Sequence, residues 1–284
     1  MRLRLKHVAG FRYSGIVHAS YNEARLLPSD LEGQLVLTSR LSIKPRAAQY
    51  PYTDYFGTNV VAFEVLTPHQ ELTVESACHV ETSRERPGEE PAASSATWED
   101  LSSDRCREVR LIEYSRQSRR TQPVDEVVAL AQQAAADAET PAQAAEAICR
   151  LVGMRMEYMP GVTGVNSTAA EAWEKGRGVC QDITHIALGA LRCAGIPARY
   201  VSGYLHPRRD PKVGETVEGE SHAWVEYYCG DWIGFDPTNL ITIGDRHILV
   251  ARGRDYDDIA PIRGVYNGDG TSEMFVKVEI TRVA

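Results

Sequence analysis

The sequence predicts an α+β protein in which an N-terminal antiparallel β domain precedes a domain of helices packed on a second antiparallel sheet. Over roughly the first eighty residues, short apolar–polar alternations are separated by Pro, Gly and Asp, which is typical of an antiparallel sandwich or meander. After Pro123 the apolar period becomes helical, and near Ser221 it returns to two. We place the boundary within residues 105–122 and expect domains at 1–115 and 116–284.

Four segments of the first domain alternate with the period of a β-strand. They are Arg2–Val8, Gln34–Lys44, Asn59–Leu66 and Glu71–Val80. We expect a further strand at 274–280, after an Asp-Gly hairpin turn at 269–270. We interpret the four histidines of the first domain as surface or hydrogen-bonded sheet residues; they are His7, His18, His69 and His79.

Helical signals follow a stretch, residues 83–104, that is rich in Pro, Glu, Ala and Ser. We interpret this stretch as a linker or loose crossover. An apolar stripe over 124–131 predicts the first helix. Thr140–Gln143 combines an N-cap, a proline and the Gln of a capping box, and the helix that it opens should end at Gly153.

Two more helices are predicted on either side of a Gly-Arg-Gly segment. Thr168–Glu171 opens the first of them, which should end near Gly176. The second follows this segment, has Cys180 in its first turn, and has an apolar stripe on one face. Gly195 can adopt the left-handed conformation that ends a helix, and Pro197 prevents its continuation.

Cys180 is therefore expected in the first turn of a helix. Unpaired backbone N–H groups and the positive end of the helix dipole favour a thiolate there, and the same groups can receive an oxyanion. The alternative is that Cys180 is a small apolar residue, buried and inert. On the same helix we expect Cys193 to lie mid-helix without a partner, and we interpret it and His185 as structural. Asp182 should cap the helix or favour its dipole.

Ser221–Tyr228 and Trp232–Asp236 both alternate and flank a Gly-Asp turn, which predicts a β-hairpin. A two-residue loop would place Asp236 on the opposite face from His222. A loop of three or five residues instead pairs residue 236 with residue 224, so that Asp236 lies diagonal to His222, roughly 7–8 Å away at Cα. We predict the loop of odd length.

Cys180, His222 and Asp236 together supply a thiol, an imidazole and a carboxylate, which are the groups of a cysteine nucleophile, its base and the orienting acid. Each residue alone has a structural explanation. Their joint occurrence, in segments that antiparallel pairing can bring together, favours catalysis. Cys180, His185 and His222 lack the spacing of zinc ligands, and we expect neither a metal nor an organic cofactor.

Composition and charge restrict the other function classes. The 284 residues carry a formal net charge of −8 with scattered Lys and Arg, so we expect no binding to nucleic acid. The first residues are charged and alternating, unlike a signal peptide or a membrane span, and we expect no membrane association. Six widely spaced cysteines without a Cys-x-x-Cys pair indicate free thiols in a reducing compartment, by default the cytoplasm.

The motifs resemble the transglutaminase-like superfamily in its bacterial form with an N-terminal β domain. The matching segments are Gly178–Asp182, Cys193–Tyr204, Ser221–Trp224 and Phe235–Thr238, with further similarity at Tyr55–Asn59, Gly253–Asp258 and Ala260–Gly264. The resemblance implies a papain-like α+β core and a Cys-His-Asp triad, carried onto Cys180, His222 and Asp236. It does not choose the reaction, because the family includes protein cross-linkers, peptidases, amidases and amide-forming enzymes.

We expect a hydrolase that cleaves a peptide or amide bond, in a peptide or protein substrate, through a thioester on Cys180. Acyl transfer to an amine is the alternative, and the third hypothesis is a binding module without catalytic activity. We interpret Trp173 and Tyr158, the candidates for an oxyanion side chain, as packing residues. Residues 206–220 are expected to form a flap beside the cleft or a solvated loop. The natural substrate and the oligomeric state are left open.

Overall fold

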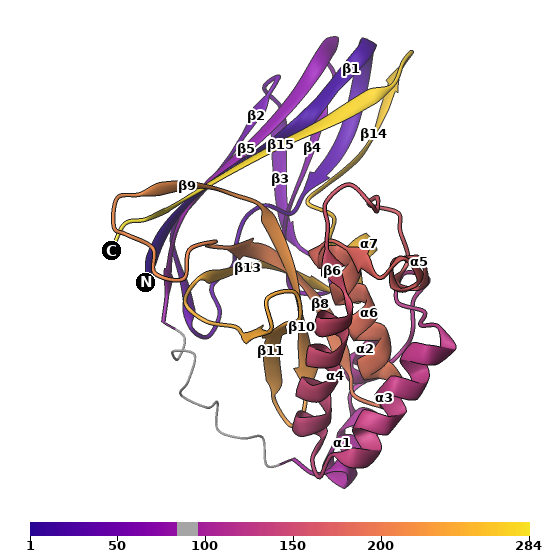
Figure 1. The fold of residues 1–284 in the computed structure, drawn as a ribbon. Helices are drawn as coiled ribbons and strands as arrows, with labels where there is room; N and C mark the ends of the chain where they lie inside the picture. The colour runs from indigo at the N-terminus through magenta and orange to yellow at the C-terminus, as the bar shows by residue number, and fades with distance from the viewer. Residues whose placement is uncertain (84–95) are drawn as a thin grey trace.

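The computed structural model describes residues 1–83 and 96–284, with the backbone alone at 104–107. An eight-stranded antiparallel sheet occupies one end of the molecule (Figure 1). Five of its strands come from the first domain: β1 (Arg2–Ala24), β2 (Gln34–Lys44), β3 (Ala48–Thr53), β4 (Asn59–Val65) and β5 (His69–Thr82). The other three come from the second half of the chain: β9 (Thr216–Gly219), β14 (Ile262–Gly268) and β15 (Ser272–Arg282).

The long strand β1 runs through the centre of this sheet. Its first half pairs with β5 on one edge and β15 on the other, and its second half pairs with β4 and β14. The sheet folds over where these partners change, and a core of apolar side chains from both halves, including Ala9, Val74, Phe63 and Ile262, forms inside it. The N-terminal antiparallel β domain is therefore confirmed.

Three details of this sheet differ from the prediction. The strand β3 was not predicted. All of its residues are exposed and they include Pro51, as suits an edge strand. β1 extends far beyond Val8; Gly15 in its middle leaves room for the carbonyl of Asp269, where a Cβ would lie 1.9 Å away. The hairpin predicted at 269–270 is wrong: that segment joins β14 to β15, but both strands pair with β1 and not with each other.

A second antiparallel sheet carries the predicted hairpin, with the order β12-β11-β10-β8-β13. Its strands are β8 (Ala198–Leu205), β10 (Ser221–Tyr228), β11 (Trp232–Asp236), β12 (Ile241–Thr242) and β13 (His247–Gly253). Two short segments, β6 (Glu157–Tyr158) and β7 (Arg177–Gly178), form a separate parallel pair. The predicted fold class, helices packed on a second antiparallel sheet, is confirmed.

Helix α6 (Cys180–Cys193) is the centre of the helical layer. It packs on β8 and β10 on one side and against α3, α4 and α5 on the other (Figure 1). All residues from Asp182 to Arg192 are buried, so the helix is enclosed on every side and not only along its apolar stripe. The remaining helices are α1 (Trp98–Arg107), α2 (Val109–Tyr114), α3 (Asp125–Asp137), α4 (Pro141–Arg155), α5 (Ala169–Lys175) and α7 (Tyr256–Ile259).

The helix-capping predictions are confirmed, with one exception. Thr140 and Thr168 each form a capping box, and Gly176 and Gly195 adopt positive φ of 66° and 82° at helix ends. The exception is Gly153, where α4 does not end. A Cβ there would lie 2.0 Å from the carbonyl oxygen of Pro237, so this glycine allows α4 to approach the segment that follows Asp236.

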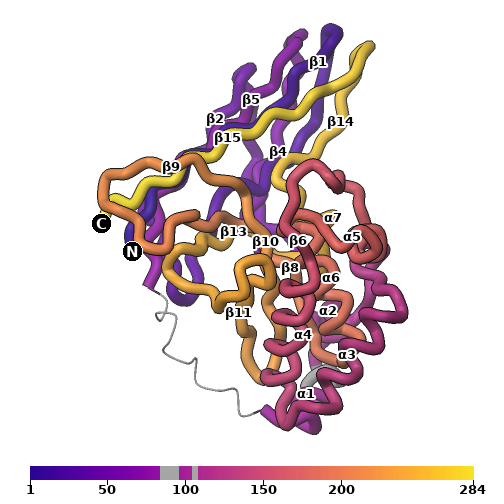
Figure 2. Tube along the Cα trace, viewed as in Figure 1, coloured from indigo at the N-terminus to yellow at the C-terminus, as the bar shows by residue number. Residues whose placement is uncertain are grey.

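Of the linker predicted at 83–104, residues 84–95 lie outside the described part of the chain, and 98–104 are helical in α1. The domain division at residue 115 stays a prediction, although β9, β14 and β15 from beyond it complete the first sheet. The two ends of the chain lie side by side where β1 begins and β15 ends (Figure 2). Among the described residues, no helix has the length and apolar character needed to cross a membrane.

Candidate active site

Cys180 is the first residue of α6, directly after the N-cap residue Val179. The carboxylate of Asp182 accepts hydrogen bonds from the backbone N–H of Val179 (2.8 Å) and the hydroxyl of Thr163 (2.7 Å). The prediction that Asp182 caps the helix is confirmed. Since a helix leaves its first N–H groups without intrahelical acceptors, the N–H groups of Cys180 and Gln181 can donate to a ligand.

The β10–β11 hairpin has the predicted register. Tyr228 pairs with Trp232, so three residues form the loop, and the same register places residue 236 opposite residue 224. His222 and Asp236 are therefore diagonal neighbours. Nε2 of His222 lies 2.6 Å from Oδ2 of Asp236. The prediction of the odd-length loop is confirmed; the catalytic role of the pair stays a prediction.

Asp236 is fully buried and surrounded by hydrogen-bond donors. Oδ1 accepts from the backbone N–H groups of Thr238 (3.0 Å) and Asn239 (3.1 Å). Oδ2 accepts from His222 and from the Asn239 side chain (2.8 Å), and Nε2 of His247 lies 3.5 Å from it. Burial alone would raise the pKa of Asp236, but hydrogen bonds and charges from the two histidines hold it well below its usual range. Asp236 is an anion at neutral pH.

His222 has the opposite charge. Burial alone would lower its pKa, but hydrogen bonds to Asp236 and Cys180, and the charges of both groups, raise it from 6.5 to about 10. Because Nε2 is held by Asp236, the other ring nitrogen, Nδ1, is the one left for the thiol. The imidazole can thus hold a proton between Cys180 and the leaving group of a substrate.

His247 is a residue of this site that sequence analysis did not identify. It begins β13, is 1 % exposed, and its Nδ1 accepts from the backbone N–H of Gly244 at 3.2 Å. That bond directs Nε2 toward Asp236. No motif around residue 247 indicated this position, because β13 and β11 are separate strands that the sheet brings together.

Cys180 and His222 line a cavity of about 700 Å³ between the two sheets. Tyr200 and Tyr256 contribute to its wall from the core. The first sheet contributes apolar and polar residues of β1, β9 and β15, namely His7, Glu218, Gly219, Met274, Val276, Lys277 and Val278. A second cavity, of about 500 Å³, shares His222 with the first and includes Asn239 and Arg246. His222 therefore faces space on two sides.

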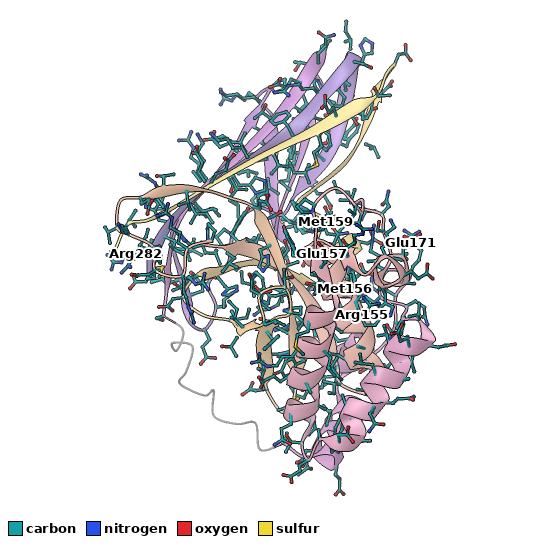
Figure 3. The ribbon with its side chains drawn as sticks, viewed as in Figure 1. Arg155, Met156, Glu157, Met159, Glu171 and Arg282 are labelled. Carbon is teal, nitrogen blue, oxygen red and sulfur yellow. The ribbon has the colours of Figure 1, made fainter. Side chains whose placement is uncertain are left out.

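Tyr158 and Glu220 stand between these two cavities and line both. The Tyr158 hydroxyl donates to Oε2 of Glu220 at 3.4 Å. Tyr158 reaches this position on β6, directly after α4, where Figure 3 labels its neighbours Met156, Glu157 and Met159. Burial, and then the charges of Cys180 and Glu220, raise the pKa of Tyr158 to about 12. Tyr158 is therefore a neutral hydrogen-bond donor on the cavity wall. The prediction that it is a packing residue is wrong.

The other oxyanion candidate is different. Trp173 is 3 % exposed, and its Nε1 donates to Glu126 at 2.8 Å. It does not line the cavity that contains Cys180. Trp173 is thus a packing residue, as predicted.

The structural interpretations of His185 and Cys193 agree with their surroundings. His185 is fully buried, burial lowers its pKa to about 3, and its Nε2 accepts from the backbone N–H of Tyr256 at 3.2 Å. Cys193, expected to be mid-helix without a partner, instead ends α6 and accepts from the Gln117 amide at 3.4 Å.

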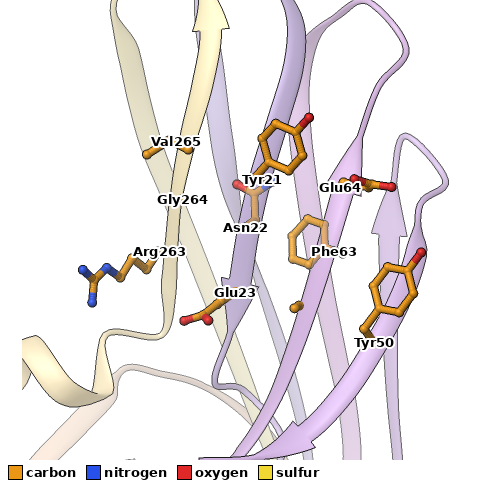
Figure 4. A pocket seen from close by; sticks show the side chains of 10 residues that line it. Tyr21, Asn22, Glu23, Tyr50, Phe63, Glu64, Arg263, Gly264 and Val265 are labelled. Carbon is orange, nitrogen blue, oxygen red and sulfur yellow. The ribbon is translucent and has the colours of Figure 1, made fainter.

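His7 is a hydrogen-bonded sheet residue, as predicted, since it lies in β1 and its Nδ1 is 2.6 Å from the hydroxyl of Tyr204. It also lines the cavity of Cys180, which was not predicted. A third hollow, of about 600 Å³, lies on the first sheet between β14, β1, β4 and β3 (Figure 4). Its lining carries neither a thiol nor an imidazole. Within the described residues, no three His, Cys, Asp or Glu side chains are placed to hold a metal ion.

The comparisons with known proteins agree with this architecture. Residues 128–237 match the transglutaminase-like superfamily, and residues 3–81 match the bacterial transglutaminase-like N-terminal region. A crystal structure from Cytophaga hutchinsonii, named as a putative cysteine protease, has a TM-score of 0.77 at 22% identity and covers 98% of this chain and 90% of that one. At this identity the likeness concerns the fold.

Relatives of similar length are found in mycobacteria. An uncharacterized protein of Mycobacterium leprae is 44% identical over 287 residues, which cover 100% of this chain and 99% of that protein. An uncharacterized protein of Mycobacterium tuberculosis is 30% identical, with 98% of this chain and 92% of that protein covered. A protein-glutamine gamma-glutamyltransferase of Pseudomonas aeruginosa is 32% identical, but over only 28% of this chain and 12% of that protein. The chain belongs to the transglutaminase-like superfamily.

Proposed function

We propose that the chain is a cysteine-nucleophile hydrolase that cleaves a peptide or amide bond through a thioester on Cys180. One arrangement carries the proposal: a buried Asp236 anion holds a cationic His222, and the same imidazole reaches Cys180 on the wall of a cavity of about 700 Å³. These are the parts of an activated thiol, its base and the orienting acid.

The proposed reaction has two steps. The Cys180 sulfur, its proton transferred to His222, attacks the carbonyl carbon, and the resulting tetrahedral oxyanion is stabilised by the N–H groups of Cys180 and Gln181 at the start of α6. The imidazolium then gives its proton to the nitrogen, the C–N bond breaks, and the amine leaves. In the second step His222 takes a proton from water, whose oxygen attacks the thioester carbon. The C–S bond then breaks, the acid is released, and Cys180 is left as the thiolate beside protonated His222.

Acyl transfer to an amine is the second candidate. Glu218 and Glu220 are exposed and line both cavities beside His222. Their carboxylates would attract a primary ammonium group, and His222 could then accept its proton before attack on the thioester. This reaction forms a new amide in place of the free acid. A cross-linked product without free acid, measured by mass balance with an added primary amine, would favour this second candidate.

A binding module that keeps the fold without the chemistry is the third candidate. Iodoacetamide labelling separates it from both enzymes, because an activated thiol reacts at neutral pH. Burial raises the pKa of Cys78, Cys149, Cys193 and Cys229, so these thiols should react slowly. We expect selective labelling of Cys180 that disappears in His222→Ala. Equal labelling in both proteins would contradict an enzyme of this type.

Acyl adducts on Cys180 would identify the substrate. We expect mass spectrometry of the protein, after exposure to a peptide mixture, to detect thioester adducts at Cys180 that are absent from Cys180→Ala. We also propose a cytoplasmic protein that acts on peptides or protein amides without a cofactor and without binding to nucleic acid or membrane. The cysteines whose side chains are described are free, which supports a reducing compartment.

A further inference from the structure

Strand β15 has one edge that is only partly paired. On one side, its residues from Ser272 to Arg282 pair with β1. On the other side, β9 pairs only with Val278–Thr281. In the part of the chain that the structure describes, no strand pairs with residues 272–277 on that second edge. Backbone groups along this edge are available to a further strand.

This open edge borders the cavity of Cys180. Met274 and Val276, on the same face of β15, are 46% and 50% exposed and line that cavity. The chain that occupies the paired part of the edge, β9, ends at Gly219 and continues into β10, where His222 is the second residue (Figure 1). The open edge is therefore the continuation of β9 along β15, and its inner end lies beside the catalytic base.

A buried imidazole lies at the same inner end. His7 pairs with Val278, is 2% exposed, and its Nδ1 lies 2.6 Å from the hydroxyl of Tyr204. Burial lowers the pKa of His7 to about 4, so its ring is neutral. Nε2 has no hydrogen-bond partner among the described residues. A buried ring nitrogen without a partner is unfavourable, and a peptide group of a ligand, which offers both a C=O and an N–H, would satisfy it in either tautomer.

We propose that the 272–277 edge of β15 binds the acyl-donor substrate as an extended polypeptide strand in line with β9, with apolar side chains toward Met274 and Val276. The substrates would then be extended polypeptide segments and not isolated small amides. Main-chain hydrogen bonds to β15 would supply affinity, and the half-exposed apolar residues would supply selectivity. This inference rests on the proposed function, since it assumes that Cys180 is acylated.

The test uses peptidyl chloromethyl ketones, which alkylate the thiol irreversibly. Acetyl-leucyl chloromethyl ketone is compared with versions extended at the N-terminus to three and five Ala and Leu residues. The rate constant for modification of Cys180 should rise about tenfold or more from one residue to five. N-methylation of single amides in the five-residue probe should remove part of this gain at every second position, because alternate amides of a strand face its neighbour.

Variants then locate the site of the gain. Val276→Asp should abolish the length dependence, so that the five-residue probe modifies Cys180 no faster than acetyl-leucyl chloromethyl ketone does in the same variant. Val265→Asp is the matched control, because Val265 is 68% exposed on β14 of the same sheet and lines the other hollow. It should behave as wild type.

The outcomes separate the inference from the proposed function. In one outcome, iodoacetamide labels Cys180 in a His222-dependent manner while the rate of modification does not rise with probe length. That result overturns the inference and leaves the proposed enzyme activity standing. A length gain that persists in Val276→Asp, or that N-methylation reduces without a period of two, also overturns it. Absence of His222-dependent labelling by any probe overturns the proposed function itself.

Discussion

Replacing Asp236 by Asn tests whether this carboxylate keeps His222 charged. Asn has nearly the same shape and still offers an oxygen to Nε2, but it lacks the negative charge. In the wild type, burial of the ring is outweighed by Asp236 and Cys180, which raise the pKa of His222 from 6.5 to about 10. Without the carboxylate, burial is opposed by Cys180 alone. We expect the pKa of His222 to fall by at least about 2, which corresponds to about 3 kcal/mol.

NMR titration of imidazole signals measures this change. His222 can be assigned by comparison with His222→Gln, and Asp231→Asn is the matched control because that exposed residue lies in the loop of the same hairpin. The control should leave the pKa of His222 near 10. A wild-type His222 that titrates near 6.5, or one that is unchanged in Asp236→Asn, would refute the argument for the ion pair.

Stability should follow the same linkage. A group whose pKa is higher in the folded state stabilises the protein fully below its unfolded pKa and loses that effect as the pH rises through the folded value. For His222 the window runs from 6.5 to about 10. The difference in the free energy of unfolding between wild type and Asp236→Asn should therefore narrow between pH 7 and pH 10.5 in urea denaturation. A constant difference would contradict the assignment.

Three other substitutions probe the supports of the site. Gly153→Ala places a Cβ against the carbonyl of Pro237 and should lower the free energy of unfolding by about 1–3 kcal/mol. Gly164 has open space around it, so Gly164→Ala should leave this free energy unchanged. Equal effects of the two substitutions would contradict the packing argument. Glu226→Gln removes a buried carboxylate that two arginines bind, and it should lower the free energy of unfolding in urea by about 3 kcal/mol. A decrease of less than about 1 kcal/mol would show that these charged side chains are solvated. His247→Phe removes an imidazole whose Nε2 lies 3.5 Å from Oδ2 of Asp236, and it should slow Cys180 alkylation at pH 6 about tenfold. An unchanged rate would make His247 a packing residue only.

The geometry of the hairpin could be predicted because it depends on local information. A Gly-Asp turn and two alternating runs leave few registers, and only odd loops place His222 and Asp236 on one face. The position of Cys180 at a helix start was likewise visible, since the residues around it carry the signals of a helix beginning and a helix end. In both cases the determining residues are close together in sequence.

The rest of the site depends on how distant segments meet. His247 reaches Asp236 because β13 joins the second sheet on the far side of β8, and neither strand contains a signal of that pairing. Met274 and Val276 alternate like any strand residues, so their periodicity could not show that one edge of β15 would stay open beside a cavity. The local pattern predicted the strand β15, but only long-range pairing placed its open edge beside the cavity.

On the proposed function and the inference about β15, the second domain would carry the chemistry and the first sheet would carry substrate selection. Cys180, His222 and Asp236 all lie within the segment, 128–237, that matches the transglutaminase-like core. The wall that faces them comes from β1 and β15, which pair with each other from the two ends of the chain. On the proposed function, changes in β15 could alter which polypeptide is acylated without touching the ion pair, because no residue of that strand contacts His222 or Asp236 through a described hydrogen bond.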